Sequence, residues 1–179
     1  MKFGKFALVS VLFISPLYLH ADDAKKKEPV KKEEKKDSCG ISITGTDQMS
    51  FQMDGKKLES INVPKGCKTF KVHLEYSGKL GSSTMGHNFN VTEEKDAEAV
   101  YNEILKIGAD KEYKIADLKK KPFDKLLATS NQLVGGGEKD VKSVDVEINM
   151  KKFNKGKKYK FFCAFPGHFG IMNGTFIVN

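Results

Sequence analysis

The segment Thr69–Tyr76 alternates between polar and apolar side chains at every position. Successive side chains of a β-strand point to opposite faces of its sheet, so this alternation predicts a strand with one buried face and one face in solvent. His73 falls on the polar face, opposite Phe70, Val72 and Leu74, and is expected to face solvent. A chain built on such strands must cover their apolar faces, which favours two packed sheets.

Seven further segments are short and β-like, with turn-forming residues between them. They are Ile41–Thr44, Phe51–Met53, Asn88–Val91, Leu126–Val134, Val141–Ile148, Tyr159–Phe165 and Gly174–Val178. One segment differs, because apolar residues recur at helical spacing between Thr92 and Gly108. Its capping hydroxyl and acidic first turn are typical of a helix start. The pattern therefore predicts an all-β, antiparallel Greek-key β-sandwich of about eight strands with one helical insertion over about 93–108.

The N-terminal part of the chain has a different character. A cationic start, the apolar run Phe6–Leu19 and the small residue Ala21 predict that residues 1–21 are a cleaved secretory signal, which implies a periplasmic location. An uncleaved membrane anchor is the alternative. Residues 22–38 are almost entirely Lys, Glu and Asp, so they are predicted to be a disordered linker. One folded domain is then expected over 39–179.

The net charge of the chain is +8, and all 31 of its basic residues are lysines. Specific nucleic-acid recognition favours the arginine fork on guanine and phosphate, so nucleic acid is not an expected partner. A solvated lysine surface is the simpler interpretation, and such a surface could steer an acidic protein partner.

Three residues with metal-binding chemistry lie close together near the end of the chain, in the order Cys163-x4-His168-x3-Met172. With a second imidazole from His87, they make a His2Cys set with a weak thioether, which is the ligand set of blue-copper electron-transfer sites. Taken singly, each has a simpler interpretation, since a buried Cys behaves as a small hydrophobe and Met fills gaps in a core. Their common spacing favours a metal site.

The chain has three cysteines, an odd number for an exported protein. If Cys163 is the metal thiolate, Cys39 and Cys67 are left to pair, and export makes a disulfide chemically reasonable. A bridge across the 27 intervening residues would stabilise the fold by about 3–4 kcal/mol in the chain-entropy model.

Several of these segments resemble a known family. Met85–Asn88 and the Cys-x-Phe-Pro-Gly-His-x3-Met-x-Gly-Thr pattern within Phe161–Thr175 strongly resemble azurin, a family of bacterial blue-copper cupredoxins. Asp47–Phe51 and Gly137–Asp140 resemble further azurin segments, and the early cysteine pair matches the family's disulfide in placement. The resemblance covers Cys39–Asn179. It implies a cupredoxin-like fold, one copper (Cu(I)/Cu(II)) per chain, and an electron carrier rather than an enzyme.

The resemblance also implies ligands of unequal strength. His87, Cys163 and His168 would be the equatorial copper ligands. Met172 would be a long axial thioether, and the carbonyl of Gly86 the weak contact on the opposite side. The backbone of the chain would then take part in the site together with its side chains.

Residues around the ligands are implied to tune the site. The side chain of Asn88 would hold the ligand loop, and the backbone N–H groups of Asn88 and Phe165 would donate to the sulfur of Cys163. Two positions depart from the family pattern. Phe89 stands where azurins usually carry a buried Trp, and Phe169 stands where a small polar residue is common.

An apolar surface around His168 is expected to dock redox partners, because brief encounters favour small interfaces with little desolvation cost. Its members would be Met49, Leu80, Met85, Phe165, Pro166, Gly167, Phe169 and Gly170. The expected partners are c-type cytochromes, a reductase or a peroxidase. A copper-handling protein without an electron-transfer role is the alternative function. A zinc-bound structural protein also stays open.

Overall fold

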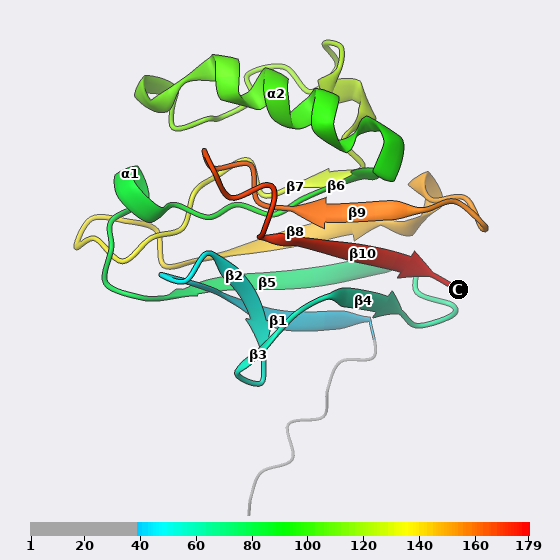
Figure 1. Cartoon of the computed structure of the whole chain (residues 1–179). Helices are drawn as coiled ribbons and strands as arrows, with labels where there is room; N and C mark the ends of the chain where they lie inside the picture. Colours follow the sequence, from blue (N-terminus) through cyan, green and yellow to red (C-terminus); the bar gives the residue numbers. More distant parts are fainter. Residues whose placement is uncertain (1–38) are drawn as a thin grey trace, which may run out of the picture. The chain divides into compact units, whose positions relative to one another are not determined.

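The structure is a computed structural model that describes residues 39–179 (Figure 1). The predicted signal (1–21) and linker (22–38) lie outside the described residues. Two five-stranded sheets make up the domain, so the predicted β-sandwich is confirmed. Across the described residues, no helix combines the length and apolar character needed to cross a membrane.

The first sheet contains the strand with the clearest alternation. Its order is β3 (Lys56–Lys57), β2 (Ser50–Met53), β1 (Gly40–Thr46), β5 (Thr69–Ser77) and β8 (Ser143–Asn149). Strand β1 runs parallel to β5, and the other neighbours are antiparallel. The expectation of a wholly antiparallel sandwich was therefore wrong, because β1 pairs with β5 across an intervening crossover to the other sheet. Phe70, Val72 and Leu74 are buried. His73 lies on the outer face, where its Nδ1 donates to Asp145 over 2.7 Å.

The second sheet contains two strands that carry the metal-site segments. Its order is β4 (Ser60–Val63), β10 (Asn173–Val178), β9 (Tyr159–Phe162), β6 (Asn90–Glu93) and β7 (Ala128–Thr129). Strand β4 runs parallel to β10, and the other pairs are antiparallel. Neither β3 nor β4 was predicted. The partner of β4 is the last strand of the chain, so the local sequence carries little sign of this pairing.

Aromatic rings fill the space between the sheets. The rings of Phe89 and Phe161 stack with centroids 5.7 Å apart, and Phe51 packs at 5.8 Å and 5.9 Å from them. Phe89 has 0% of its surface exposed. A phenylalanine thus fills this part of the core, where the family usually has a tryptophan.

The helical insertion is present, with different boundaries. A 3-10 turn, η1 (Glu94–Asp96), leads into α2 (Ala97–Ile107), and Gly108 ends the helix with φ +87°. Thr92 was expected to cap the helix, but it lies in β6 and its Oγ1 donates to the carbonyl of Glu93. The remaining short helices are α1 (Ser82–Met85), η2 (Ala109–Lys111), η3 (Phe123–Lys125) and η4 (Met150–Lys152).

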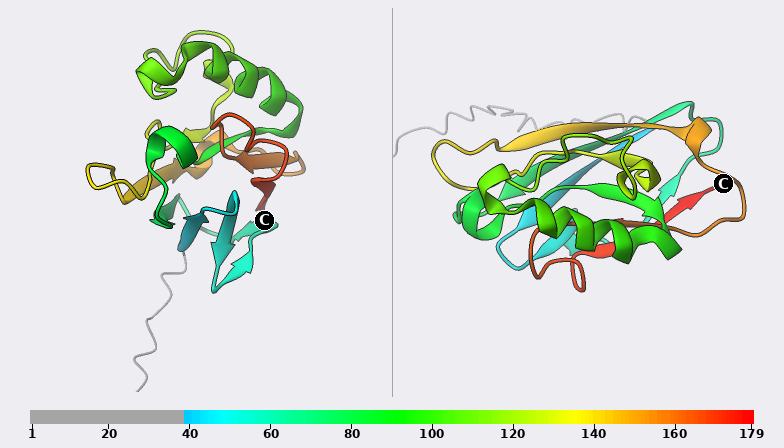
Figure 2. Two further views of the ribbon diagram at one scale, coloured as in Figure 1. Left: turned by 60° about the vertical axis from the view of Figure 1, so that its left-hand side comes forward. Right: turned by 90° about the horizontal axis from the view of Figure 1, so that it is seen from above.

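Helix α2 lies over the outer face of the second sheet, and a second hydrophobic cluster fills the space beneath it (Figure 1, Figure 2). The buried members of this cluster are Ala97, Val100, Ile104, Ile115, Phe123, Leu126, Phe162 and Ala164. Phe161 and Cys163 belong instead to the core between the sheets. Residues near the end of β9 therefore alternate between the two clusters, with Cys163 facing the inner one.

Two predicted strands are shorter than expected. Only Ala128–Thr129 of the segment Leu126–Val134 is a strand, and Val134 forms an isolated bridge with His87. Asn131 interrupts the segment with φ +46°, and its side chain bonds to both backbone groups of Ile115. Strand β9 ends at Phe162 rather than at residue 165, because the next residues turn into the C-terminal loop.

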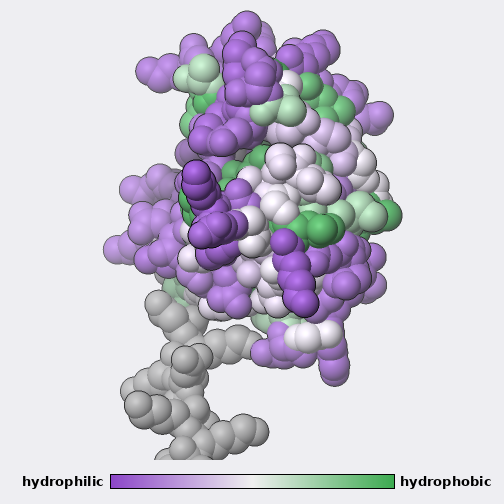
Figure 3. Space-filling view, turned by 90° about the vertical axis from the view of Figure 1, so that its left-hand side faces the viewer, coloured by the Kyte–Doolittle hydropathy of each residue, from purple (hydrophilic) through white to green (hydrophobic). Residues whose placement is uncertain are grey.

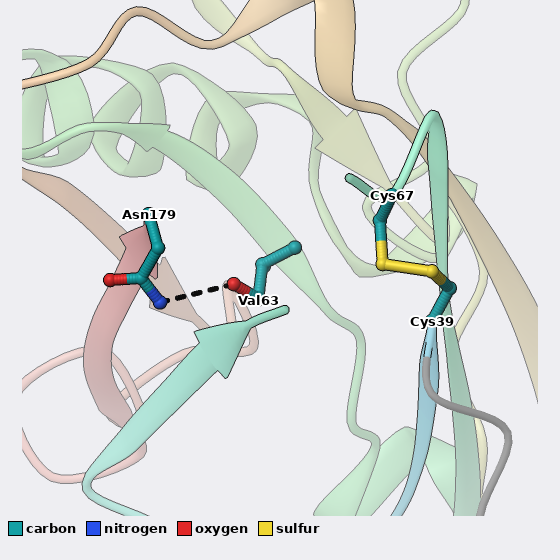
Figure 4. The surroundings of a disulfide bond; sticks show 4 residues. All are labelled: Cys39, Val63, Cys67 and Asn179. Atoms are coloured by element: carbon teal, nitrogen blue, oxygen red, sulfur yellow. Dashed lines mark hydrogen bonds between the residues drawn. A yellow bond between two sulfur atoms is a disulfide. The ribbon is translucent and has the colours of Figure 1, made fainter. Parts of the chain in front are cut away.

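The predicted disulfide between Cys39 and Cys67 is confirmed (Figure 4). It joins the residue before β1 to the turn before β5, and the carbonyl of Cys39 also accepts a hydrogen bond from the N–H of Lys71 over 2.9 Å. Figure 4 also shows the side chain of Asn179 donating to the carbonyl of Val63 over 3.2 Å. This bond adds a side-chain link from the residue after β10 to β4.

Candidate metal centre

The C-terminal loop (residues 163–172) folds back on itself through its own backbone. The N–H of Cys163 donates to the carbonyl of Met172 over 2.9 Å, and the N–H of Met172 donates to the carbonyl of His168 over 2.7 Å. The N–H of His168 donates to the carbonyl of Phe165 over 3.0 Å. Gly167 has φ +80°, a conformation that favours glycine, at the tip of this turn. The loop therefore brings Cys163, His168 and Met172 together.

A second segment approaches this loop from the end of α1. His87 is held by two backbone hydrogen bonds with Val134, of 3.0 Å and 2.8 Å. A Cβ on the preceding residue, Gly86, would lie 2.4 Å from the carbonyl oxygen of Ser82, so this close approach requires glycine. Ser82 is anchored in turn by Asp140, which accepts from both its N–H and its hydroxyl.

Three possible ligand atoms meet in the interior. The Nδ1 atoms of His87 and His168 lie 3.2 Å apart, and the Sγ of Cys163 lies 3.9 Å and 3.6 Å from them. Metal–nitrogen bonds of about 2.0 Å and metal–sulfur bonds of about 2.3 Å, arranged trigonally, separate nitrogen from nitrogen by about 3.5 Å and sulfur from nitrogen by about 3.8 Å. The donor set and its spacing fit one soft-to-borderline metal ion such as copper.

A hydrogen bond fixes the tautomer of His87. Its Nε2 donates to the carbonyl of Thr46 over 2.9 Å, so Nδ1 is left with its lone pair directed at the thiol. The same strand presents Gly45, where a Cβ would lie 2.6 Å from the Cδ2 of His87. The ring of Tyr76 covers His87 at 5.3 Å. Sequence reasoning missed these contacts, because nothing near His87 in the sequence indicates them.

Beside His87, Tyr76 and Asp47 form a polar pair. Asp47 accepts hydrogen bonds from the hydroxyl of Tyr76 and, over 3.0 Å, from the N–H of Lys79. The bond from Tyr76 is the main cause that lowers the pKa of Asp47, and burial is the main cause that raises the pKa of Tyr76. This pair connects β1 and the end of β5 on the side where His87 lies.

Burial controls the protonation of the three possible ligands in the metal-free protein. It raises the pKa of Cys163 to about 12, although the backbone N–H groups of Asn88 and Phe165 bond to the sulfur and favour the thiolate. It lowers the pKa values of His87 and His168 to about 4. At neutral pH the metal-free site therefore holds a protonated thiol and two neutral imidazoles.

The side chain of Asn88 connects the two ligand segments. Its Oδ1 accepts a hydrogen bond from the N–H of Ala164 over 2.7 Å and another from the Nδ2 of Asn90 over 2.9 Å. Asn88 is 3% exposed, so these bonds are shielded from water. It thereby fixes the residue after Cys163 relative to the residue after His87.

Two weaker donors lie in the same region. The carbonyl oxygen of Gly86 is 3.9 Å from the Sγ of Cys163. Met172 is 1% exposed and belongs to the same hydrophobic cluster as Cys163. The carbonyl of Gly86 thus lies near the thiol, and both residues are shielded from solvent.

The surface over this site is partly apolar. Seen from the side on which α1 lies in Figure 1, a pale to green central area is bordered by hydrophilic side chains (Figure 3). Leu80 is 41% exposed and Ile171 is 46% exposed. Pro166, Gly167 and Gly170 are also exposed, and Met49 and Met85 are half-buried. Ile171 was not predicted in this surface.

Two members of the expected docking surface have mainly internal contacts. Phe165 is 8% exposed and packs between Tyr113 and His168, at 5.7 Å and 4.8 Å. Phe169 is half-buried and stacks on Tyr101 of α2 at 4.5 Å. The ring of His168 lies beneath the surface, since the residue is 2% exposed.

The fold and the site have clear relatives. Residues 37–179 match the family described as copper binding proteins, plastocyanin/azurin family. The azurin of Pseudomonas fluorescens biotype B is 38% identical over 137 residues, which cover 76% of this chain and 95% of the relative. The azurin of Alcaligenes faecalis is 38% identical over 138 residues, covering 77% of this chain and 96% of the relative.

A solved structure is similar as well. The azurin of the obligate methylotroph Methylomonas sp. strain J aligns with a TM-score of 0.65 and 30% sequence identity, covering 79% of this chain and 98% of that one. The likeness therefore extends over nearly the whole of each of these relatives. The family match over residues 37–179 includes His87, Cys163 and His168.

Proposed function

The chain belongs to the plastocyanin/azurin family of copper binding proteins, and we propose that it carries single electrons between exported redox proteins as a blue copper protein. The observation that carries this proposal is the buried group of His87, Cys163 and His168, with ligand atoms within 4.8 Å of one another. In this proposal these three residues would hold the copper ion. Met172 and the carbonyl of Gly86 would be its weaker contacts.

The chain supplies metal-ligand atoms that are held in place and shielded from water. Bound copper supplies one-electron chemistry between Cu(I) and Cu(II). The ring of His87 is held by Thr46 over 2.9 Å, and the thiol segment is held by Asn88 over 2.7 Å. Donors held in this way keep one geometry in both oxidation states, which keeps reorganisation small. The N–H groups of Asn88 and Phe165 at the sulfur stabilise its thiolate form.

Burial argues against the alternative of a copper-handling protein. Such a protein needs an open site that exchanges its metal. Here His87 is 0% exposed, Cys163 is 0% exposed and His168 is 2% exposed. The burial of all three ligands also supports a carrier rather than an enzyme.

The partners in this proposal are c-type cytochromes, a reductase or a peroxidase, and the location is the periplasm. Docking would use the exposed apolar surface over His168, in which Leu80, Pro166 and Ile171 are the most accessible members by side chain. The shortest route for an electron passes through the ring of His168, because the loop that carries it forms this surface. A small apolar interface suits brief encounters.

Copper titration of the purified protein tests the proposal. We expect an intense visible charge-transfer band from the thiolate, which a mild reductant removes and an oxidant restores. Cys163→Ser should abolish the band, and Cys39→Ser with Cys67→Ser should leave it. A wild-type protein that binds copper without this band would contradict the proposed function.

A further inference from the structure

Tyr101 of helix α2 contacts the C-terminal loop at two of its residues. The ring of Tyr101 stacks on the ring of Phe169 with centroids 4.5 Å apart and planes inclined by 12°. The hydroxyl oxygen of Tyr101 also accepts a hydrogen bond from the N–H of Gly167 over 3.4 Å. Tyr101 therefore contacts the residues on both sides of His168.

The ring of Phe169 is held from two further sides. It meets Phe162 edge-on at 5.2 Å, and the Nζ of Lys160 lies 5.4 Å from its centroid. Both of these residues belong to β9, the strand that leads into Cys163. Phe169 is half-buried, whereas its neighbours Gly167 and Gly170 are exposed. The ring thus turns inward, although it stands in the most exposed part of the loop.

The C-terminal loop is also held by hydrogen bonds between its own residues. Its backbone bonds join Cys163 to Met172 and His168 to Phe165, all within the loop itself. These bonds set the local fold of the loop. They do not join the tip around His168 to the body of the domain, so a contact from outside the loop has a separate effect on the tip.

We propose that Tyr101 is a positioning residue for His168: its stack on Phe169 and its bond to Gly167 hold the tip of the C-terminal loop against α2. The role in positioning a copper ligand rests on the proposed function. An aromatic pair contributes about 0.5–1.5 kcal/mol beyond its buried area, which corresponds to an about two- to twelvefold change in local opening. This range is measurable by hydrogen exchange without unfolding the domain.

The test compares amide hydrogen exchange in the metal-free protein across a set of variants. Tyr101→Leu removes the stack and the acceptor, and Phe169→Leu removes the same stack from the loop side, so the test does not depend on one variant folding. The exchange rates of the His168 and Met172 amides should rise about two- to twelvefold in each single variant. Exchange in the double variant should rise by less than the product of the two single effects, because both changes remove the same stack of Tyr101 on Phe169.

Two control variants distinguish the positioning of His168 from a general loosening of the domain. Ile104→Val removes one methyl group from the cluster under α2 and leaves the stack of Tyr101 on Phe169 in place, so it should raise exchange at His168 less than Tyr101→Leu or Phe169→Leu does. Tyr101→Phe keeps the stack, so only the amide of Gly167 should exchange faster. Equal rates at His168 in all variants, additive effects in the double variant, or the same rise in Ile104→Val would each overturn the proposal.

The copper-loaded protein supplies a second readout. The visible band should shift in Tyr101→Leu and Phe169→Leu, because the orientation of His168 changes, and stay in place in Ile104→Val. An unshifted band in the first two variants would count against positioning of the ligand. A wild-type protein without the band would contradict the proposed function, while the exchange results would still decide whether Tyr101 holds the loop.

Discussion

The ring of His87 is fixed by Thr46, whose carbonyl oxygen accepts a hydrogen bond from its Nε2 over 2.9 Å. The neighbour of Thr46 in β1, Gly45, leaves the space that the ring occupies. The last two residues of β1 therefore determine which nitrogen of His87 faces the thiol and where the ring lies. Such outer contacts commonly change metal affinity by about 10–100-fold when they are lost.

Gly45→Ala should weaken copper binding by about tenfold or more. The added Cβ would lie 2.6 Å from the Cδ2 of His87, so the ring must move away from the other ligands. Competition with a copper chelator measures the affinity. Gly170→Ala is the matched control, because a Cβ there meets nothing within 4 Å. Equal affinities for the two variants would show that the ring of His87 tolerates displacement.

Asn88→Ala should destabilise the metal-free protein by about 1–3 kcal/mol, because the buried N–H of Ala164 loses its acceptor. Denaturant unfolding gives the free energy. Asn62 provides the control, since it is exposed on β4 and its change to Ala should stay within about 0.5 kcal/mol. A similar small effect for Asn88→Ala would mean that water replaces the lost acceptor.

Copper uptake near pH 7 should release one proton per chain. In the metal-free site burial holds the pKa of Cys163 at about 12 and the pKa values of His87 and His168 at about 4. Only the thiol then carries a proton that the metal must displace, and the number should rise toward three as the pH falls through 4. Calorimetry in buffers of different ionisation enthalpy counts the protons. Two or three protons at pH 7 would mean that the imidazoles are charged before copper binds.

Replacing Cys39 and Cys67 by Ser should lower stability by about 3–4 kcal/mol in the chain-entropy model, given their sequence separation of 28. The visible spectrum of the copper-loaded protein should not change. The bridge stands before the first residue of β1, whereas Thr46 at the last residue contacts His87. Thermal unfolding and absorption are measured on the same sample. A shifted band would show that the two ends of β1 are coupled.

Leu80→Lys should slow electron self-exchange by about tenfold or more while leaving the visible band in place, because two like charges would meet when two molecules dock by this surface. Met85→Lys should act in the same direction. Ile177→Lys adds the same charge on β10 at a residue that is 37% exposed, and it should have little effect. Equal slowing by all three would indicate a general effect of net charge rather than docking at this surface.

Phe169 was also expected in the docking surface, because it follows His168 in the sequence. Its ring instead packs on Tyr101, at 4.5 Å. A lysine at this position would remove that contact as well as add charge. Leu80 and Met85 therefore test the docking surface more directly.

The strands and ligands that could be predicted are those with a local signature. The alternation over Thr69–Tyr76 identifies β5 within one residue of its end. The spacing from Cys163 to Met172 describes a loop whose hydrogen bonds join residues of that same loop. In the first case the alternation marks the buried face of the strand, and in the second the hydrogen bonds join residues close together in the sequence.

The elements that could not be predicted depend on distant partners. Strand β4 pairs with β10, more than a hundred positions later, and the segment after Ala128–Thr129 stops pairing because Asn131 bonds to Ile115 instead. Gly45 is a residue without a side chain, and its role appears only where the ring of His87 fills the space above it. Local sequence patterns do not indicate contacts between residues that are this far apart in the sequence.

The burial of Cys163 in the core between the two sheets has a consequence before any metal is bound. Oxidation of a cysteine and its exchange with disulfides both require an accessible thiolate. Cys163 is 0% exposed, and its thiol keeps its proton at neutral pH. Once the domain has folded, this sulfur is chemically inert toward oxidants and toward the Cys39–Cys67 bridge, so a metal-free molecule can persist in an oxidising compartment with its third cysteine intact.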